Sequence, residues 1–254
     1  MRDAPAVAPA GLDQLLAGAT ERTVLAEAPG KSGARLERVV IAGQPYVLKH
    51  LDLAEDWTMR ASGCLAGAPL LAWERGILAR LPACFNQPIV GVVRAYGHGA
   101  APSGGCALLM RDVSPWLVPA TDEPIGLDQH LRFLRHMAAL HAAFWGCGAE
   151  CEVVPAMHRY LELSPWLAVA EAAVGSAHLV PRLVGEGWPR LAEVAPAAAA
   201  IVTPLARDPG PLVAALEATP QTFVHSNWKL DNLGTDDDGR TVLLDWEQPG
   251  RGAA

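Results

Sequence analysis

The segment that most constrains the fold of this chain lies near its end, in residues 225–247. A polar loop that contains His225 and Asn232 leads into the turn Asp236–Gly239, and a short apolar run then ends in Asp245. An Asp-Gly turn between two apolar runs is a strong local signal of a β-hairpin. The sequence therefore predicts a hairpin with polar residues at both of its ends.

Composition limits the partners that this chain can have. Its 254 residues include 20 Lys and Arg against 27 Asp and Glu, a formal net charge of −7, so the basic surface of a nucleic-acid-binding protein is missing. We therefore expect a small-molecule partner and no nucleic acid. No run approaches the roughly 20 apolar residues of a membrane span, and the first residues lack the charged-then-apolar order of a signal peptide. These features predict a cytoplasmic protein without a membrane partner.

Two regions of different pattern predict an α+β protein with two lobes. Residues 1–112 contain one helical stretch, at 70–81, and alternating or β-branched runs that predict strands at 24–27, 36–41, 46–51, 92–96 and 106–110. Residues 113–254 are mainly helical in pattern: two apolar stripes over 127–146 predict a deeply buried helix, and six prolines between 181 and 211 predict a series of short helices.

Lys49 and Glu74 form a candidate pair. Lys49 ends an apolar β-run, and Glu74 falls in the middle of the apolar face of the helix expected at 70–81. Because burying an unpaired charge costs several kcal/mol, a buried Glu74 needs a cation such as Lys49. The alternative is that both are solvated, Lys49 at a strand end and Glu74 at the edge of a shorter stripe.

Six segments, in this order, resemble the aminoglycoside phosphotransferase family of the protein-kinase-like superfamily. They are the nucleotide-lysine strand Tyr46–Lys49, the pairing helix Trp73–Arg75, the hinge Leu108–Asp112, the Leu-His-Ala helix Met137–Trp145, the catalytic loop His225–Asn232 and the metal segment Leu244–Glu247. The resemblance covers most of the chain. It implies a bilobal protein-kinase-like fold, with a small β-rich N-lobe at 1–112 and a helical C-lobe at 113–254, that transfers phosphate from ATP with Mg²⁺ to a hydroxyl of a small molecule.

The resemblance also implies which residues bind the nucleotide. Lys49 would bind the α- and β-phosphates, and Glu74 would orient Lys49. Backbone groups of the hinge would receive the adenine, at Leu109, Met110 and Asp112. The turn Pro29–Gly33 lacks the glycine pattern of protein kinases, but Ser32 and nearby backbone amides could still cover the phosphates.

The catalytic loop matches the family except at one position. Asn232 and Asp245 would bind Mg²⁺, and His225 would shape the loop. The family has an Asp two residues after this His, where it takes or orients the proton of the acceptor hydroxyl; here the residue is Asn227, whose amide cannot take a proton. Either Asn227 orients the hydroxyl, or Asp231 substitutes as base, although Asp231 is more typical of a surface carboxylate. The alternative is a catalytically impaired pseudokinase or scaffold that binds nucleotide.

The chain ends soon after the metal segment, at Ala254, whereas family members continue with further helices. We therefore expect a truncated C-lobe and an incomplete acceptor site. The acidic turn Asp236–Asp238 suits a cationic amino-sugar acceptor, and it equally suits a solvated hairpin turn. The sequence does not identify the acceptor.

Overall fold

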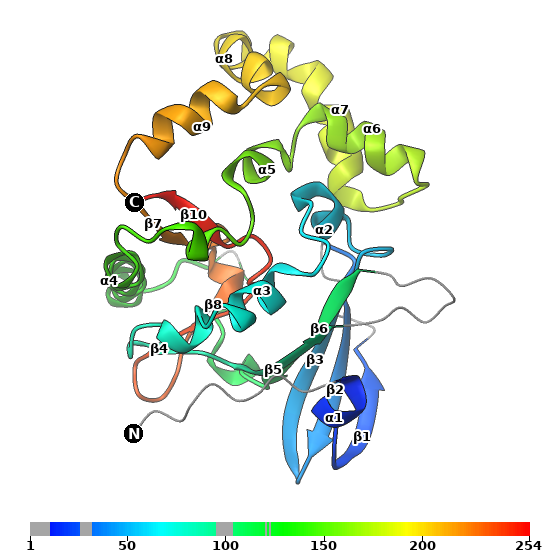
Figure 1. Cartoon of the computed structure of the whole chain (residues 1–254), viewed down its shortest axis with the longest axis vertical. Coiled ribbons are helices and arrows are strands. Elements are labelled where there is room, and N and C mark those ends of the chain that lie inside the picture. Colours follow the sequence, from blue (N-terminus) through cyan, green and yellow to red (C-terminus); the bar gives the residue numbers. More distant parts are fainter. Residues whose placement is uncertain (1–10, 26–31, 95–103, 120, 122) are drawn as a thin grey trace.

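The computed structural model describes residues 11–25, 32–94, 104–119, 121 and 123–254 (Figure 1). Its largest sheet is antiparallel, with the strand order β1-β2-β3-β6-β5. The strands are β1 (Ala19–Val24), β2 (Arg35–Ile41), β3 (Gln44–Asp52), β5 (Ile89–Arg94) and β6 (Gly105–Arg111). The predicted three-strand meander and the two later strands are confirmed, except that β1 precedes the run expected at 24–27. The turn before Ser32 lies outside the described residues.

A two-residue turn, Ala42-Gly43, sets the register of the central strands. Both residues have positive φ, 50° and 76°, which is the backbone geometry of a type I′ hairpin turn. The resulting register pairs Lys49 with Leu36 of β2 on one side and with Leu108 of β6 on the other. Lys49 therefore lies on the central strand of the sheet rather than at an exposed edge.

The two faces of this sheet belong to different cores, because successive side chains of a strand point to opposite faces. One face, with Val39, Leu48 and Leu109, is covered by the short helix α1 (Leu12–Leu15). The other face, with Val92 and Leu108, is part of the main core, which continues into the helices and the C-terminal strands. Lys49 is on the strand positions of this second face.

Helix α3 (Ala68–Glu74) is shorter than the helix predicted at 70–81. It ends because Gly76 adopts the left-handed conformation, with φ of 67°, and the amide of Ile77 donates to the carbonyl of Ala72 at 3.0 Å. A separate 3-10 turn, η1 (Leu78–Arg80), follows. Glu74 is consequently the last residue of its helix and does not lie in the middle of a buried face.

The second half of the chain is mainly helical, and with the sheet it confirms the predicted α+β class. The helices are α4 (Leu127–Ala143), α5 (Ala156–Leu161), α6 (Pro165–Ala173), α7 (Leu179–Val194), α8 (Pro196–Arg207) and α9 (Gly210–Glu217). The prediction that α4 is deeply buried is wrong, because Phe133 and Leu140 are buried while Leu127 and Leu134 are 69% and 40% exposed. The helix buries one face only.

Prolines end fewer helices than predicted. Pro196 begins α8 and Pro209 precedes α9, as expected of residues that lack a backbone N–H. Pro189 and Pro204 instead lie inside α7 and α8. The helices between 165 and 220 are therefore fewer and longer than the proline spacing indicates.

Short strands near the C-terminus form the predicted hairpin. β8 (Leu233–Thr235) pairs antiparallel with β9 (Thr241–Leu243), and β4 (Phe85–Asn86) adds a parallel strand. β7 (Gln221–Val224) pairs with β10 (Gly250–Ala253). In the turn, Asp236 is 5% exposed and accepts hydrogen bonds from Arg240 and Asn86, so its carboxylate is structural and not solvated.

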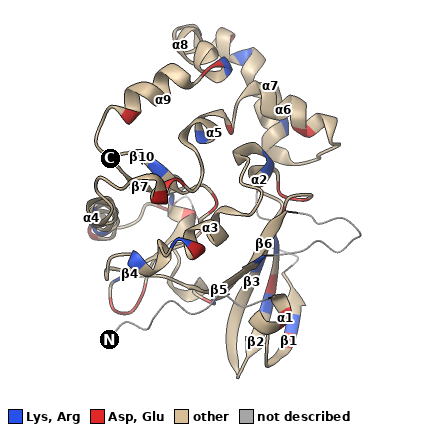
Figure 2. Cartoon of the chain, in the orientation of Figure 1, with Lys and Arg blue, Asp and Glu red and all other residues tan. Residues whose placement is uncertain are grey.

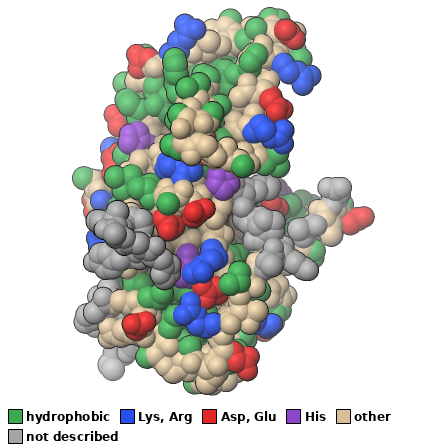
Figure 3. Space-filling view, turned by 90° about the vertical axis from the view of Figure 1, so that its right-hand side faces the viewer, with side chains coloured by type: hydrophobic (Ala, Val, Ile, Leu, Met, Phe, Trp, Pro, Cys, Tyr) green, Lys and Arg blue, Asp and Glu red, His purple; other side chains and the backbone are tan. Residues whose placement is uncertain are grey.

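Charged residues of both signs are distributed along the whole ribbon (Figure 2). Apolar side chains gather on the surface of the helical end, where α6, α7 and α8 expose Trp166, Leu183 and Ile201 (Figure 3). Within the described ranges, no helix has the length and the apolar content that crossing a bilayer requires.

Candidate functional site

A cavity of about 670 Å³ lies beside the second face of the sheet and is also lined by the segments that flank the C-terminal hairpin, within 226–232 and 244–248. It collects most of the residues that the sequence proposed for a site: Ser32, Lys49, Met110, Asp112, Asn227, Asn232 and Asp245. These residues come from four separate parts of the chain. Their convergence on one cavity makes it the candidate nucleotide site.

Lys49 is held between two carboxylates at the floor of this cavity. Its Nζ lies 2.9 Å from Oδ1 of Asp245, and it forms a second, closer ion pair with Glu247. Burial alone lowers the pKa of Lys49, but Glu247 and Asp245 outweigh burial and hold that pKa above its usual range. Burial raises the pKa of Asp245, but Lys49 overcomes this effect and holds that pKa below its usual range. Lys49 is therefore a fixed cation.

Glu247 lines the same cavity, and the sequence did not single it out as a candidate site residue. Its side chain is 8% exposed, and Oε2 accepts a hydrogen bond of 3.3 Å from the hydroxyl of Thr58. Burial raises the pKa of Glu247 above its usual range, and the charge of Lys49 opposes this shift. The signal in the sequence was its place at the end of the metal segment Leu244–Glu247, two residues after Asp245.

The predicted pairing of Lys49 with Glu74 is wrong. The Glu74 side chain is 38% exposed, and its carboxylate accepts hydrogen bonds from Nη2 of Arg94 at 3.0 and 3.1 Å. The physical reason is the early end of α3 at Gly76, which leaves Glu74 at the helix terminus. Glu74 does not line the cavity.

The catalytic loop is joined to the metal segment by hydrogen bonds. Nδ2 of Asn227 donates to Oδ2 of Asp245 at 2.6 Å, and Nδ2 of Asn232 donates to the carbonyl of Asn227 at 2.9 Å. Ser226 and Asp245 have positive φ, 63° and 66°. Left-handed conformations of residues other than glycine are costly and cluster at functional sites. This pattern fits a loop whose shape is held by its own side chains.

His225 is a buried residue that contacts the catalytic loop. It is 2% exposed, its Nδ1 accepts a hydrogen bond of 3.3 Å from the amide of Asn227, and its ring packs edge-on against Trp246 at 4.7 Å. Burial lowers the pKa of His225 to about 4, although Asp245 opposes the shift. A neutral, enclosed imidazole of this kind shapes the loop and does not reach the cavity.

Asp231 points away from the site. Its side chain is 57% exposed and lies 3.7 Å from Nζ of Lys229, and it does not line the cavity. Lys229 does line the cavity. The geometry therefore offers no support for Asp231 as a replacement base.

The part of the cavity next to the hinge is apolar. Leu36, Val47, Leu108 and Met110 line it, while Leu109 faces the opposite side of the sheet and is 4% exposed. Asp112 is held at the rim, where its Oδ1 accepts from the amide and hydroxyl of Ser114 at 3.1 and 2.6 Å. Among the hinge residues, Leu109 can thus contribute only backbone groups, whereas Met110 contributes its side chain.

Ser32 lies at the edge of the same cavity and is 8% exposed. Its hydroxyl accepts a hydrogen bond of 3.4 Å from the amide of Ala34. Residues 26–31 lie outside the described part of the chain, so the geometry locates Ser32 itself and leaves the phosphate-covering turn a prediction.

Oxygen ligands for a divalent cation are present but few. Asp245 supplies a carboxylate and Asn232 an amide oxygen, and both line the cavity. No group of three or more His, Cys, Asp or Glu side chains that could hold a metal occurs among the described residues. Mg²⁺ at nucleotide sites typically takes one or two carboxylates, with phosphates and waters completing the octahedron. This donor set therefore fits Mg²⁺ bound together with a triphosphate.

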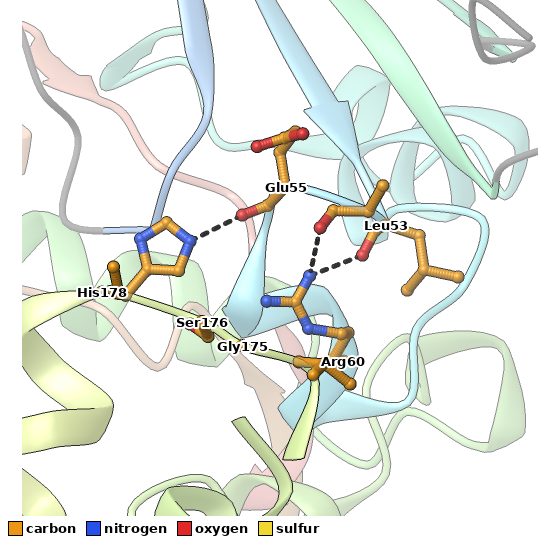
Figure 4. Close-up of a pocket in the computed structure, with 9 residues that line it drawn as sticks. Leu53, Glu55, Arg60, Gly175, Ser176 and His178 are labelled. Carbon is orange, nitrogen blue, oxygen red and sulfur yellow. Dashed lines mark hydrogen bonds between the residues drawn. The ribbon is translucent and has the colours of Figure 1, made fainter. Parts of the chain in front are cut away.

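A second cavity, of about 550 Å³, lies between the loop that joins β3 to α2 (Trp57–Ser62) and the α6–α7 loop (Figure 4). Its one guanidinium, Arg60, is fully engaged: it donates to the carbonyls of Leu53 and Ala54 and forms two hydrogen bonds, of 2.8 and 2.7 Å, with the carboxylate of Glu171. Nε2 of His178 donates a hydrogen bond of 2.8 Å to the carbonyl of Glu55. These contacts brace the two loops, and among the described residues that line the cavity no Lys or Arg is left without a carboxylate or carbonyl partner.

Comparison with known proteins identifies the fold. No family model and no curated protein matches this chain. Among solved structures, a thermostable mutant of aminoglycoside phosphotransferase APH(4)-Ia in its apo form aligns with a TM-score of 0.50 and 13% identity, over 92% of this chain and 69% of that one. Another structure of a thermostable mutant of that protein, a ternary complex with ADP and hygromycin B, gives a TM-score of 0.48 and 14% identity, over 94% and 70% of the two chains. An aminoglycoside phosphotransferase from Alicyclobacillus acidocaldarius gives 0.40 and 17%, over 92% and 64%. The first of these likenesses shows the kinase-like α+β fold that the sequence predicted, and at this identity it shows the fold alone.

Proposed function

We propose that this chain is a phosphotransferase that moves the γ-phosphoryl group of ATP, with Mg²⁺, to a hydroxyl of a small molecule. The observation that carries the proposal is the position of Lys49, which lies on the central strand and meets Asp245 at 2.9 Å on the floor of a large cavity. Phosphoryl transfer needs positioning and charge stabilisation more than covalent chemistry, and this arrangement supplies both.

The cavity suits a nucleotide along its whole length. Its apolar end, between Val47 and Met110, can enclose an adenine, and backbone groups of the hinge can hydrogen-bond to the base edge. Its polar end contains Lys49, whose ammonium can exchange a carboxylate partner for the phosphates. The apolar end of the cavity would thus bind the base, and the polar end would bind the phosphates.

The loop residues would hold the metal and the acceptor. Asp245 and Asn232 provide the oxygen ligands, and Mg²⁺ would neutralise the developing charge on the phosphates when bound there. Asn227 is fixed by its bond to Asp245, so its remaining amide oxygen can accept a hydrogen bond from a hydroxyl and orient it. Lys229 adds a second ammonium at the cavity wall.

A catalytically impaired nucleotide-binding protein is the second candidate, and Asn227 is the observation that favours it. The amide cannot take the proton of the acceptor. General-base help contributes typically about 10²- to 10⁴-fold, so its loss slows transfer but does not abolish the contribution of positioning and metal charge. The two candidates share the nucleotide site and differ in turnover.

An assay of phosphate transfer distinguishes the phosphotransferase from the impaired nucleotide-binding protein. ATP, Mg²⁺ and a panel of hydroxylated small molecules, amino-sugars included, are incubated with the protein and analysed by mass spectrometry for products heavier by one phosphoryl group. We expect a product with the wild-type chain and none with Asp245→Ala. Asp237→Ala is the matched control, because Asp237 is an exposed residue of the hairpin turn. The absence of any product, with ATP bound normally, would favour the impaired protein.

A further inference from the structure

The proposed reaction lacks an identified proton acceptor. Asn227 cannot serve, because its amide has no basic site at neutral pH and its Nδ2 is committed to Asp245. Asp231 is exposed and does not line the cavity. His225 is enclosed against Trp246 and does not line it either. The acceptor must therefore be sought among the other carboxylates of the cavity.

The described part of the chain offers four carboxylates at this cavity: Asp112, Glu162, Asp245 and Glu247. Two of them, Asp245 and Glu247, form the ion pairs with Lys49. A third, Asp112, accepts two hydrogen bonds from Ser114 at the hinge and lies 3.6 Å from Arg38. Glu162 differs from these three, because no hydrogen bond or ion pair joins it to another described residue. Among the described residues, it is the one carboxylate of the cavity that is not held by a hydrogen bond or an ion pair.

Glu162 stands where α5 ends, just before α6, and its side chain is partly buried at the wall of the cavity. Burial is the largest cause that raises its pKa, to about 7, and the carboxylates of Asp245 and Asp56 add to the effect. Glu162 and Asp245 line the same cavity. Mg²⁺ bound at Asp245 would offset the charge of that carboxylate, so burial would remain the main cause of the raised pKa of Glu162.

We propose that Glu162 accepts the proton of the acceptor hydroxyl, in place of the residue at 227. The inference rests on the phosphotransferase function proposed above. In the reaction, the hydroxyl oxygen forms a bond to the γ-phosphorus, and the bond from that phosphorus to the oxygen bridging to ADP breaks. ADP leaves with the electron pair of that bond, and the hydroxyl proton passes to the Glu162 carboxylate. Asn227 orients the hydroxyl and Glu162 receives its proton.

Hydrolysis of ATP tests this role without knowledge of the acceptor, because water takes the place of the hydroxyl. Glu162→Gln keeps the shape of the side chain and removes its basicity. We expect the variant to bind Mg²⁺ and ATP with a Kd within about twofold of the wild type and to hydrolyse ATP at least about 10-fold more slowly. Glu217→Gln, on the exposed end of α9, is the matched control and should hydrolyse at the wild-type rate.

A second substitution distinguishes loss of a base from local damage. Asn227→Asp, introduced into the Glu162→Gln protein, places a carboxylate beside the hydroxyl again and should recover at least part of the lost rate. A structural defect at residue 162 would not be repaired from residue 227. Circular dichroism and the Tm of each variant establish that it is folded.

Each outcome decides the question. Wild-type hydrolysis that Glu162→Gln leaves unchanged would overturn the role of Glu162 and retain the phosphotransferase. ATP binding without hydrolysis by the wild type would also overturn it and would favour the impaired nucleotide-binding protein. Failure of the folded wild type to bind ATP with Mg²⁺ would overturn the proposed function itself.

Discussion

Glu247 forms an ion pair with Lys49 from the other half of the sequence, and it does so from within the cavity. Glu74, which the sequence predicts to be the partner of Lys49, pairs instead with Arg94 at the surface. The difference changes which carboxylate holds the ammonium of Lys49 in place. The metal segment thus supplies both the candidate metal ligand, Asp245, and the support for Lys49.

Glu247→Ala should lower the free energy of unfolding by about 3 kcal/mol, because it removes a buried partner of Lys49 and leaves a void. Glu74→Ala should lower it by less than about 1 kcal/mol, since its pair with Arg94 is solvent-exposed. Urea denaturation of the two variants gives both values. Equal losses would contradict the assignment of the pair.

The imidazole of His225 should make stability depend on pH. Its pKa is lowered from 6.5 to about 4 by burial, so below pH 6.5 the unfolded chain binds a proton that the folded protein does not. The resulting stability is present above pH 6.5 and is lost as the pH falls toward 4. In His225→Gln, the slope of unfolding free energy against pH in this window should be smaller by up to about 1.4 kcal/mol per pH unit. Identical slopes from urea titrations at several pH values would show that His225 is not an enclosed neutral imidazole.

The Arg60–Glu171 brace should contribute to stability far more than an exposed ion pair does. Arg60→Ala leaves Glu171, 3% exposed, without its cation, which should cost about 3 kcal/mol. Arg182→Ala removes an ion pair whose side chains are 62% and 58% exposed, and it should cost less than about 0.5 kcal/mol. Thermal denaturation of both variants provides the comparison, and a small loss of Tm for Arg60→Ala would argue against the brace.

Local patterns predicted the strands and the hairpin well. The runs around Lys49 and the Asp-Gly turn at 238–239 carry their own register signals, so short-range rules were sufficient. Helix ends were harder. The apolar repeat over 70–81 continues past Gly76, but this glycine adopts a left-handed conformation and ends α3. Ile77, the apolar residue that follows it, is part of the main core although it lies outside the helix.

The candidate site was predicted in part. Residues identified by motif, such as Lys49, Asn232 and Asp245, do meet in one cavity. The prediction for Glu74 was wrong because it depended on a helix that continues to residue 81, whereas α3 ends at Glu74. Glu162 had no sequence signal, since its relation to the cavity arises from how α5 and α6 pack against the rest of the chain and not from any local pattern.

Calorimetric titration of ATP, with and without Mg²⁺, tests the central claim most directly. We expect Mg²⁺ to strengthen ATP binding to the wild type and to Asp237→Ala, and we expect Asp245→Ala to remove this strengthening. Folded wild-type protein that binds no ATP, or Asp245→Ala protein that retains full Mg²⁺-dependent binding, would contradict a nucleotide site built on Lys49 and Asp245.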